Sequence, residues 1–141
     1  MRCVTPLEDA QTFVIGSCPP LLPVETLLDE VVGLVLATDV VATEQVPPFD
    51  NSAVDGYAVI AADTQTVPVE LPVVAEVAAG AATDHVMRPG EAIRIMTGAP
   101  LPDGCDAVVM VEQTERLPGG RVRINAGVET GAAVRNAGDD V

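Results

Sequence analysis

The chain contains no Lys and no Trp, and among its 141 residues there are only one His, one Tyr and two Phe. Seven Arg stand against 21 Asp and Glu, which gives a formal net charge of −14 at pH 7. Nucleic acids and anionic membranes are bound by clusters of basic residues, so this charge argues against both as partners. A phosphate or other oxyanion substrate would need Arg, backbone N–H groups or a bridging cation to approach such a surface.

Cysteine and histidine are too scarce for the common metal and redox sites. The three Cys lie at positions 3, 18 and 105, and none belongs to a CxxC pair. We therefore predict neither a zinc site nor a disulfide framework, and we interpret the cysteines as reduced thiols of a cytoplasmic protein. Cys105 stands between Gly104 and Asp106, where the neighbouring charge should raise the thiol pKa, so a nucleophilic role is rejected. His85 is expected on the surface.

Long apolar runs are also missing. Gly and Pro interrupt each hydrophobic stretch before it could span a bilayer, and no basic segment precedes an apolar run as in a signal peptide. The polar Gly-Asp-Asp segment that precedes Val141 is typical of a linker. We therefore expect the natural chain to continue beyond it.

Small apolar residues and turn formers are abundant instead. Almost half of the residues are hydrophobic, and there are 12 Pro and 12 Gly. Val favours strands, and the many Pro and Gly imply short elements. In the N-terminal third, the pattern predicts an amphipathic helix over Pro6–Ile15, a strand over Pro23–Leu27, a helix over Asp29–Ala37 and a strand over Thr38–Ala42.

The rest of the chain has mainly the pattern of β-structure. Leu117–Gly120 has Pro and Gly where a type II turn of a hairpin requires them. The sequence therefore predicts an α+β fold, with a small helix/strand domain over 1–46, rejoined by 135–141, and a mainly β domain over 47–134. The predicted strands of the second part are Tyr57–Ala61, Val67–Ala78, Ala92–Met96, Ala107–Glu115, Arg121–Asn125 and Ala132–Arg135.

Two polar loops flanked by glycine are candidates for a site. The first holds Asn51, Ser52 and the pair Asp55-Gly56, and the second holds Thr97-Gly98. Asp-Gly is among the commonest turn dipeptides, and Thr97 could simply cap a turn. The alternative is a carboxylate held at a strand entrance beside a hydroxyl, on loops where sites usually lie. Local patterns leave both interpretations open. A third polar group, Asp103, Asp106 and Glu112, is expected to form a solvated acidic face.

Longer stretches around these loops resemble a known family. Pro48–Val59 (PFDNSAVDGYAV) closely resembles the signature of the molybdopterin molybdenumtransferases, the family of MoeA and the gephyrin E domain. Arg94–Val109 resembles the second signature of that family, in the same order, and Arg135–Val141 resembles a third. Departures are small: Val54 stands where Met is usual, and Cys105 where Ala is common. Family members are much longer, with a later α/β domain and a C-terminal β-barrel.

The resemblance implies insertion of molybdate into adenylated molybdopterin, with release of AMP and involvement of Mg²⁺. It implies a homodimer whose cleft lies between the α/β domain of one subunit and the β-rich domain of the other, so absent domains would hold most of the substrate. By position, Asp55 and Thr97 would be catalytic, and Asp55 would act on Mg²⁺, water or phosphate. Asn51, Ser52 and Gly98 would bind substrate. The alternative is a non-catalytic dimerisation or scaffold module of the gephyrin type.

Overall fold

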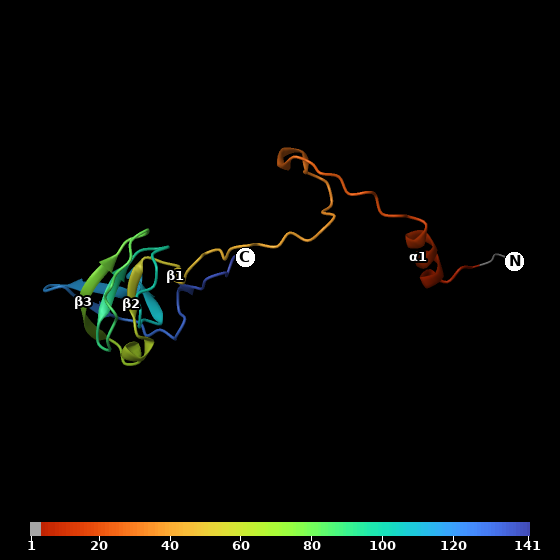
Figure 1. Ribbon diagram of the computed structural model, residues 1–141. Helices are drawn as coiled ribbons and strands as arrows, with labels where there is room; N and C mark the ends of the chain where they lie inside the picture. The colour runs from red at the N-terminus through yellow and green to blue at the C-terminus, as the bar shows by residue number, and fades with distance from the viewer. Residues whose placement is uncertain (1–3) are drawn as a thin grey trace. The chain divides into compact units, whose positions relative to one another are not determined.

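The computed structural model describes residues 4–141, which form two units that meet in sequence between Val41 and Ala42 (Figure 1). The first unit contains helix α1 (Leu7–Gly16) and one turn of 3₁₀-helix, η1 (Leu28–Glu30). Helix α1 confirms the predicted amphipathic helix to within one residue. Pro6 precedes its first turn with φ −56°, and Glu8 lies where the positive end of the helix dipole stabilises a carboxylate.

Three predicted elements of this first unit are wrong. No strand forms over Pro23–Leu27 or Thr38–Ala42, and the predicted helix Asp29–Ala37 is reduced to the single turn η1. A strand needs a hydrogen-bonded neighbour, and the described part of this unit supplies none. The predicted helix does not form beyond one turn because Val31 and Val32 are β-branched and Gly33 adopts φ +89°. The domain boundaries remain a prediction.

The second unit contains the sheets. The larger sheet has six strands in the order β5-β2-β4-β3-β7-β6, and the only parallel neighbours are β3 and β4. A separate pair, β1 (Asn51–Ser52) with β8 (Val134–Arg135), is antiparallel. The α+β fold is thereby confirmed. The six strands are β2 (Gly56–Val59), β3 (Val69–Val77), β4 (Ala92–Ile95), β5 (Ala107–Met110), β6 (Thr114–Leu117) and β7 (Arg121–Ile124).

The six-stranded sheet curls because its two edge strands are neighbours in sequence. Only the 3₁₀-turn η3 (Val111–Gln113) separates β5 from β6, yet these strands lie at opposite edges of the sheet. The edges must therefore approach each other. This topology corrects the predicted strand Ala107–Glu115, because the chain has to turn a corner in its middle. The predicted strand Tyr57–Ala61 likewise ends early, where η2 (Ala61–Thr64) begins.

The β6–β7 connection confirms the predicted hairpin. Leu117 and Arg121 face each other across the antiparallel pair, and Pro118-Gly119-Gly120 forms the loop. Gly119 has φ +77°, the positive value that the third position of a type II turn requires. Local turn chemistry therefore sets the register of these two strands.

Both faces of the sheet are buried by small side chains. In β5, Ala107 and Val109 belong to one apolar cluster, while Val108 between them belongs to the other. Tyr57 is the largest buried side chain and lies in the first cluster. Since successive side chains of a strand point to opposite faces, a run of Val and Ala can fill two cores at once. In residues 4–141, no helix is both long and apolar enough to cross a membrane.

Candidate functional site

Strand β1 brings the three signature stretches together. On one side, Asn51 faces Arg135 and Ser52 faces Val134 in β8. On the other side, the Ser52 N–H donates to the carbonyl of Ala99 at 3.0 Å, and the Gly98 N–H donates to the carbonyl of Ser52 at 2.8 Å. Segments more than 30 residues apart in the printed sequence are therefore fastened to one two-residue strand.

Asp50 ties the third stretch to the first. Its Oδ1 accepts the backbone N–H of Ala137 at 2.8 Å. The Gly138 N–H donates to the carbonyl of Pro47 at 2.9 Å, and the Asp140 N–H donates to that of Val46 at 2.9 Å. The acidic end of the described chain thus lies along residues 46–50.

Asp55 and Thr97 form the closest polar pair between the two predicted loops. Asp55 Oδ1 accepts both the Thr97 backbone N–H at 2.8 Å and the Thr97 hydroxyl at 2.7 Å. Both residues are exposed. Strand β2 begins immediately after Asp55, and β4 ends two residues before Thr97, so two neighbouring strands position the pair. The structure therefore brings the two predicted catalytic residues into direct contact.

These hydrogen bonds keep Asp55 ionised. The backbone N–H of Thr97 lowers the pKa of the Asp55 carboxyl most, followed by the Thr97 hydroxyl, while the charge of Arg94 makes a smaller contribution in the same direction. Because the pKa is lowered, the Asp55 carboxyl is fully ionised and hydrogen-bonded at any pH above the ordinary pKa of a carboxyl group. It loses this charge only as the pH falls through the lowered pKa. The Oδ2 atom accepts no hydrogen bond from residues 4–141, and Asp55 is exposed.

Asn51 and Ser52 hold the loop in this structure. Ser52 is fully buried, and its hydroxyl donates to the carbonyl of Val54 at 2.6 Å. Asn51 is 4% exposed, and its Nδ2 donates to the carbonyl of Phe49 at 3.2 Å. Gly98 is exposed and adopts φ +77°, which favours glycine. The substrate-binding roles of these three residues stay predictions.

The Asp55 carboxylate could contribute one ligand to a magnesium site. Residues 4–141 contain no group of three or more His, Cys, Asp or Glu that could enclose a metal ion. Mg²⁺ retains several waters and is usually bound through one or two carboxylates together with substrate phosphates. One ionised carboxylate with a free oxygen, on an exposed loop, is the part of such a site that this chain could supply.

Other polar residues serve the fold. Asp106 is half-buried rather than part of the predicted solvated face, because its Oδ1 accepts the Ala61 N–H at 2.7 Å. His85 Nε2 lies 2.7 Å from a carboxylate oxygen of Glu91, on a loop outside the pair described above.

Sequence reasoning did not single out Arg94, Arg116 or Arg121, which line a cavity beside Tyr57. The sequence did contain a signal for this cluster: the chain has only seven Arg and no Lys, so each cationic side chain was a candidate for binding an anion.

Cys105 should be unreactive toward alkylating reagents. Burial, and then the charge of Asp106, raise the pKa of its thiol to about 12. At pH 9, only about one such thiol in 1,000 is a thiolate, and the thiolate is the reacting form. We expect Cys105 to react with iodoacetamide at least ~100-fold more slowly than exposed Cys18, measured by peptide mass spectrometry. Equal rates in the folded protein would contradict this prediction.

Comparisons with known proteins match the chain to one family. The family model described as "MoeA N-terminal region (domain I and II)" matches residues 5–141. Molybdopterin molybdenumtransferase 2 of Mycobacterium tuberculosis is 46% identical over 141 residues, covering 96% of this chain and 34% of the relative. Molybdopterin molybdenumtransferase of Staphylococcus aureus is 36% identical over 116 residues, covering 79% of this chain and 28% of the relative.

A solved structure gives the same result. The crystal structure of the molybdopterin biosynthesis MoeA protein from Pyrococcus horikoshii OT3 has a TM-score of 0.73 and 41% identity, covering 81% of this chain and 31% of that one. The chain spans about a third of the length of the curated relatives that it matches. The family model, the relatives and the solved structure all match the same region, so the chain belongs to the molybdopterin molybdenumtransferase family, as its N-terminal region.

Proposed function

We propose that this chain supplies one wall of an active site that inserts molybdate into adenylated molybdopterin. The observation that carries the proposal is the contact between Asp55 and Thr97, which joins the two signature loops at an exposed point. A hydroxyl and an ionised carboxylate presented together can contact a metal ion, a water or a phosphate group. The relatives are named molybdopterin molybdenumtransferases, which supports the choice of reaction.

The protonation state of Asp55 favours one role over another. A general base works best when its pKa lies near the operating pH. The pKa of Asp55 is shifted the other way, below its ordinary value. The residue is therefore better suited to hold Mg²⁺ or to orient a water than to abstract a proton. Both donors of Thr97 bind Asp55 Oδ1, so Thr97 positions this carboxylate.

The charge of the chain indicates what the rest of the protein provides. A domain with a formal charge of −14 repels a substrate that carries phosphate and molybdate groups. We infer that the absent domains bind most of the substrate and that this chain acts from the opposite side. We place the reaction in the cytoplasm, where Cys18 and Cys105 stay reduced.

A chimeric enzyme tests the proposal. The N-terminal third of the Mycobacterium tuberculosis relative would be replaced by residues 1–141, and molybdenum insertion would be measured with adenylated molybdopterin, molybdate and Mg²⁺. We expect the chimera to be active and the isolated 141-residue chain to be inactive, because the isolated chain has only one wall. Turnover by the isolated chain, or a folded chimera without activity, would count against a shared site.

The first unit supports a second function, homodimerisation. Leu7, Phe13, Ile15, Leu21 and Leu22 are each more than 65% exposed, and none of residues 4–41 is buried. So many exposed large apolar side chains in one stretch favour an interaction surface. We propose that it packs against a second copy of the protein, which gives the dimer that both the catalytic and the scaffold interpretations require.

Sedimentation of two fragments measures this association. The chain 1–141 is expected to form dimers at micromolar concentration, whereas 42–141 is expected to be a folded monomer because it contains both apolar clusters. The variant Phe13→Asp should shift 1–141 toward monomer by placing a charge in the contact. Dimers of equal stability in all three proteins would refute a role for the first unit.

A further inference from the structure

A cavity of about 200 Å³ lies beside Tyr57, on the side of the sheet that carries the first apolar cluster. Five neighbouring strands, β2, β4, β3, β7 and β6, contribute to its lining. The lining includes Arg94, Arg116 and Arg121, with Glu76 as its only carboxylate among the described residues. Three of the seven cationic side chains of a strongly acidic chain thus meet at one place.

Arg94 is buried without enough partners. It is 9% exposed, and its Nη1 donates to the carbonyl of Gly56 at 2.8 Å. The guanidinium carbon lies 5.1 Å from the centre of the Tyr57 ring, a cation–π distance. Nε is buried, and no residue in 4–141 accepts from it. A guanidinium has five N–H donors, and a buried charge is costly unless those donors find acceptors.

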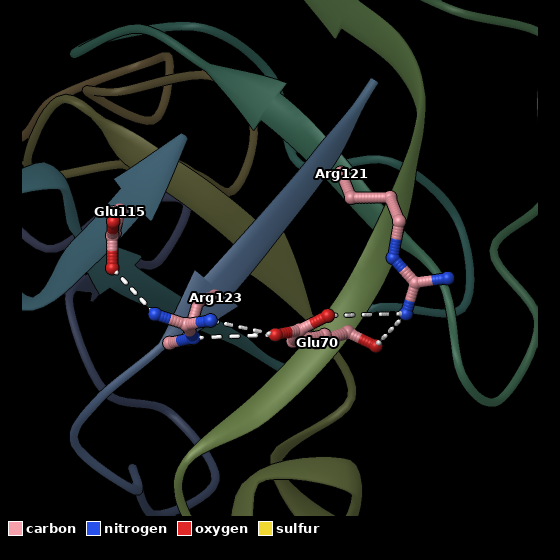
Figure 2. Close-up of polar contacts among 4 residues, drawn as sticks. All are labelled: Glu70, Glu115, Arg121 and Arg123. Carbon is pink, nitrogen blue, oxygen red and sulfur yellow. Dashed lines mark hydrogen bonds and ion pairs between the residues drawn. The ribbon is translucent and has the colours of Figure 1, made fainter. Parts of the chain in front are cut away.

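Arg116 and Arg121 lie at the exposed part of the cavity. Arg116 Nε donates to the Tyr57 hydroxyl at 3.2 Å, and its two Nη groups donate to no residue in 4–141. Arg121 Nη2 donates to the backbone carbonyl of Glu70 at 3.0 Å and lies 3.8 Å from a carboxylate oxygen of the same residue, as Figure 2 shows. Its other N–H groups donate no hydrogen bond to residues 4–141. Both side chains therefore keep donors available beside the buried charge of Arg94.

We propose that this cavity binds a small oxyanion, either a free inorganic ion or the phosphate group of an ester. Guanidinium groups bind phosphate and carboxylate oxygens through paired hydrogen bonds. Cavities for whole organic ligands measure about 300–1,000 Å³, so the observed volume suits a single anionic group. None of its lining residues belongs to the pair Asp55 and Thr97, so this site goes beyond the proposed function.

Calorimetric titration of the 141-residue chain with inorganic phosphate and sulfate tests the proposal. We expect saturable binding of one anion with a Kd on the order of 1 mM or lower at low ionic strength. Arg116→Gln and Arg121→Gln should each weaken binding by about 10-fold or more, since each removes one charged partner of the anion. Glu76→Gln should strengthen binding by removing repulsion. Absence of saturable binding at about 10 mM, roughly tenfold the expected Kd, would overturn the proposal.

Arg123→Gln is the matched control. Arg123 lies on the same strand as Arg121 but does not line the cavity, and both of its Nη groups bind carboxylates, of Glu70 at 2.9 Å and of Glu115 at 2.8 Å (Figure 2). Its substitution changes the net charge equally and should leave the Kd within about 2-fold. If Arg123→Gln weakened binding as much as Arg116→Gln, general charge attraction would explain the data and the site would be rejected.

A phosphate ester separates the two sources of the anion. Glycerol 3-phosphate that binds as tightly as inorganic phosphate supports the site and identifies the phosphate of an ester as its ligand. Binding of inorganic phosphate alone also supports the site and identifies a free ion. Far-UV circular dichroism and a thermal melt would confirm that each variant is folded, and two Arg variants are used because both residues are exposed.

Discussion

Asp55→Asn in the chimeric enzyme is expected to lower kcat/KM for molybdenum insertion by about 10²–10³-fold, the range for losing one preorganised electrostatic contact. Asn keeps the shape of Asp, and its Oδ1 can still accept both hydrogen bonds from Thr97, so the loop should remain in place. Only the negative charge is removed. The rates would be measured over a range of Mg²⁺ concentrations and of pH.

The dependence of the variant's rate on Mg²⁺ and on pH distinguishes the possible roles of Asp55. If Asp55 holds Mg²⁺, the variant should need more Mg²⁺ and should recover part of its rate when the ion is in excess. If Asp55 were a general base, the acidic limb of the pH–rate profile would disappear and excess Mg²⁺ would change nothing. Unchanged kcat/KM in Asp55→Asn would reject the proposed catalytic wall and favour the scaffold interpretation.

Thr97 provides the control for positioning. Thr97→Ser keeps the hydroxyl and should retain activity within about 10-fold, whereas Thr97→Val keeps the shape and removes one hydrogen bond to Asp55. The backbone N–H of Thr97 contributes most to the low pKa of Asp55 and survives both substitutions. We therefore expect Thr97→Val to raise the Asp55 pKa in part, toward its ordinary value.

Those features of the β-rich part that depend on residues close together in sequence could be predicted. The turn at Pro118-Gly119 depends on the conformations that those two residues adopt, so the local sequence predicts it correctly. The curl of the sheet depends on β5 and β6 lying at opposite edges, which no local pattern of Ala107–Glu115 contains. For that reason the local pattern predicts one long strand where the structure has two strands and a turn.

The predictions for the first unit are wrong for a different physical reason. Its apolar residues have the right propensities, but residues 4–41 bury none of them. Secondary structure in proteins is stabilised mostly by packing of an apolar face, so Pro23–Leu27 and Asp29–Ala37 lack what would hold them as regular elements. Helix α1 forms without such burial because its pattern, Pro6 and first-turn acids all favour a helix.

The candidate site was only half predictable. Asp-Gly and Thr-Gly indicated two loops, yet nothing in their spacing shows that Asp55 binds Thr97 or that Asp50 binds the Ala137 N–H. Those contacts depend on the antiparallel pairing of β2 with β4 and on β1 lying beside β8. The resemblance to the family supplied the roles of the residues, and the fold supplied the contacts.

Gly56→Ala is expected to destabilise the second unit by more than about 3 kcal/mol, at the upper end of the range for overpacking. A Cβ at position 56 would overlap the backbone carbonyl oxygen of Val109 and would approach Val108 Cγ1 to 3.0 Å. Gly56 does not have a positive φ, so space rather than backbone conformation excludes Ala. To admit one methyl group, β2 would have to separate from β5, with which it pairs from Gly56 to Val59.

Thermal unfolding of the fragment 42–141 measures this effect, and we expect Tm to fall by roughly 12 °C or more. Gly98→Ala is the control, because no atom beyond its own chain neighbours lies within 4 Å of the added Cβ, and only the φ of +77° opposes it. That strain costs about 1–2 kcal/mol, so the control should lose less stability. Equal losses in the two variants would contradict the argument from space. Since Gly56 follows Asp55 directly, the close packing of β2 on β5 also positions the backbone that carries the Asp55 carboxylate.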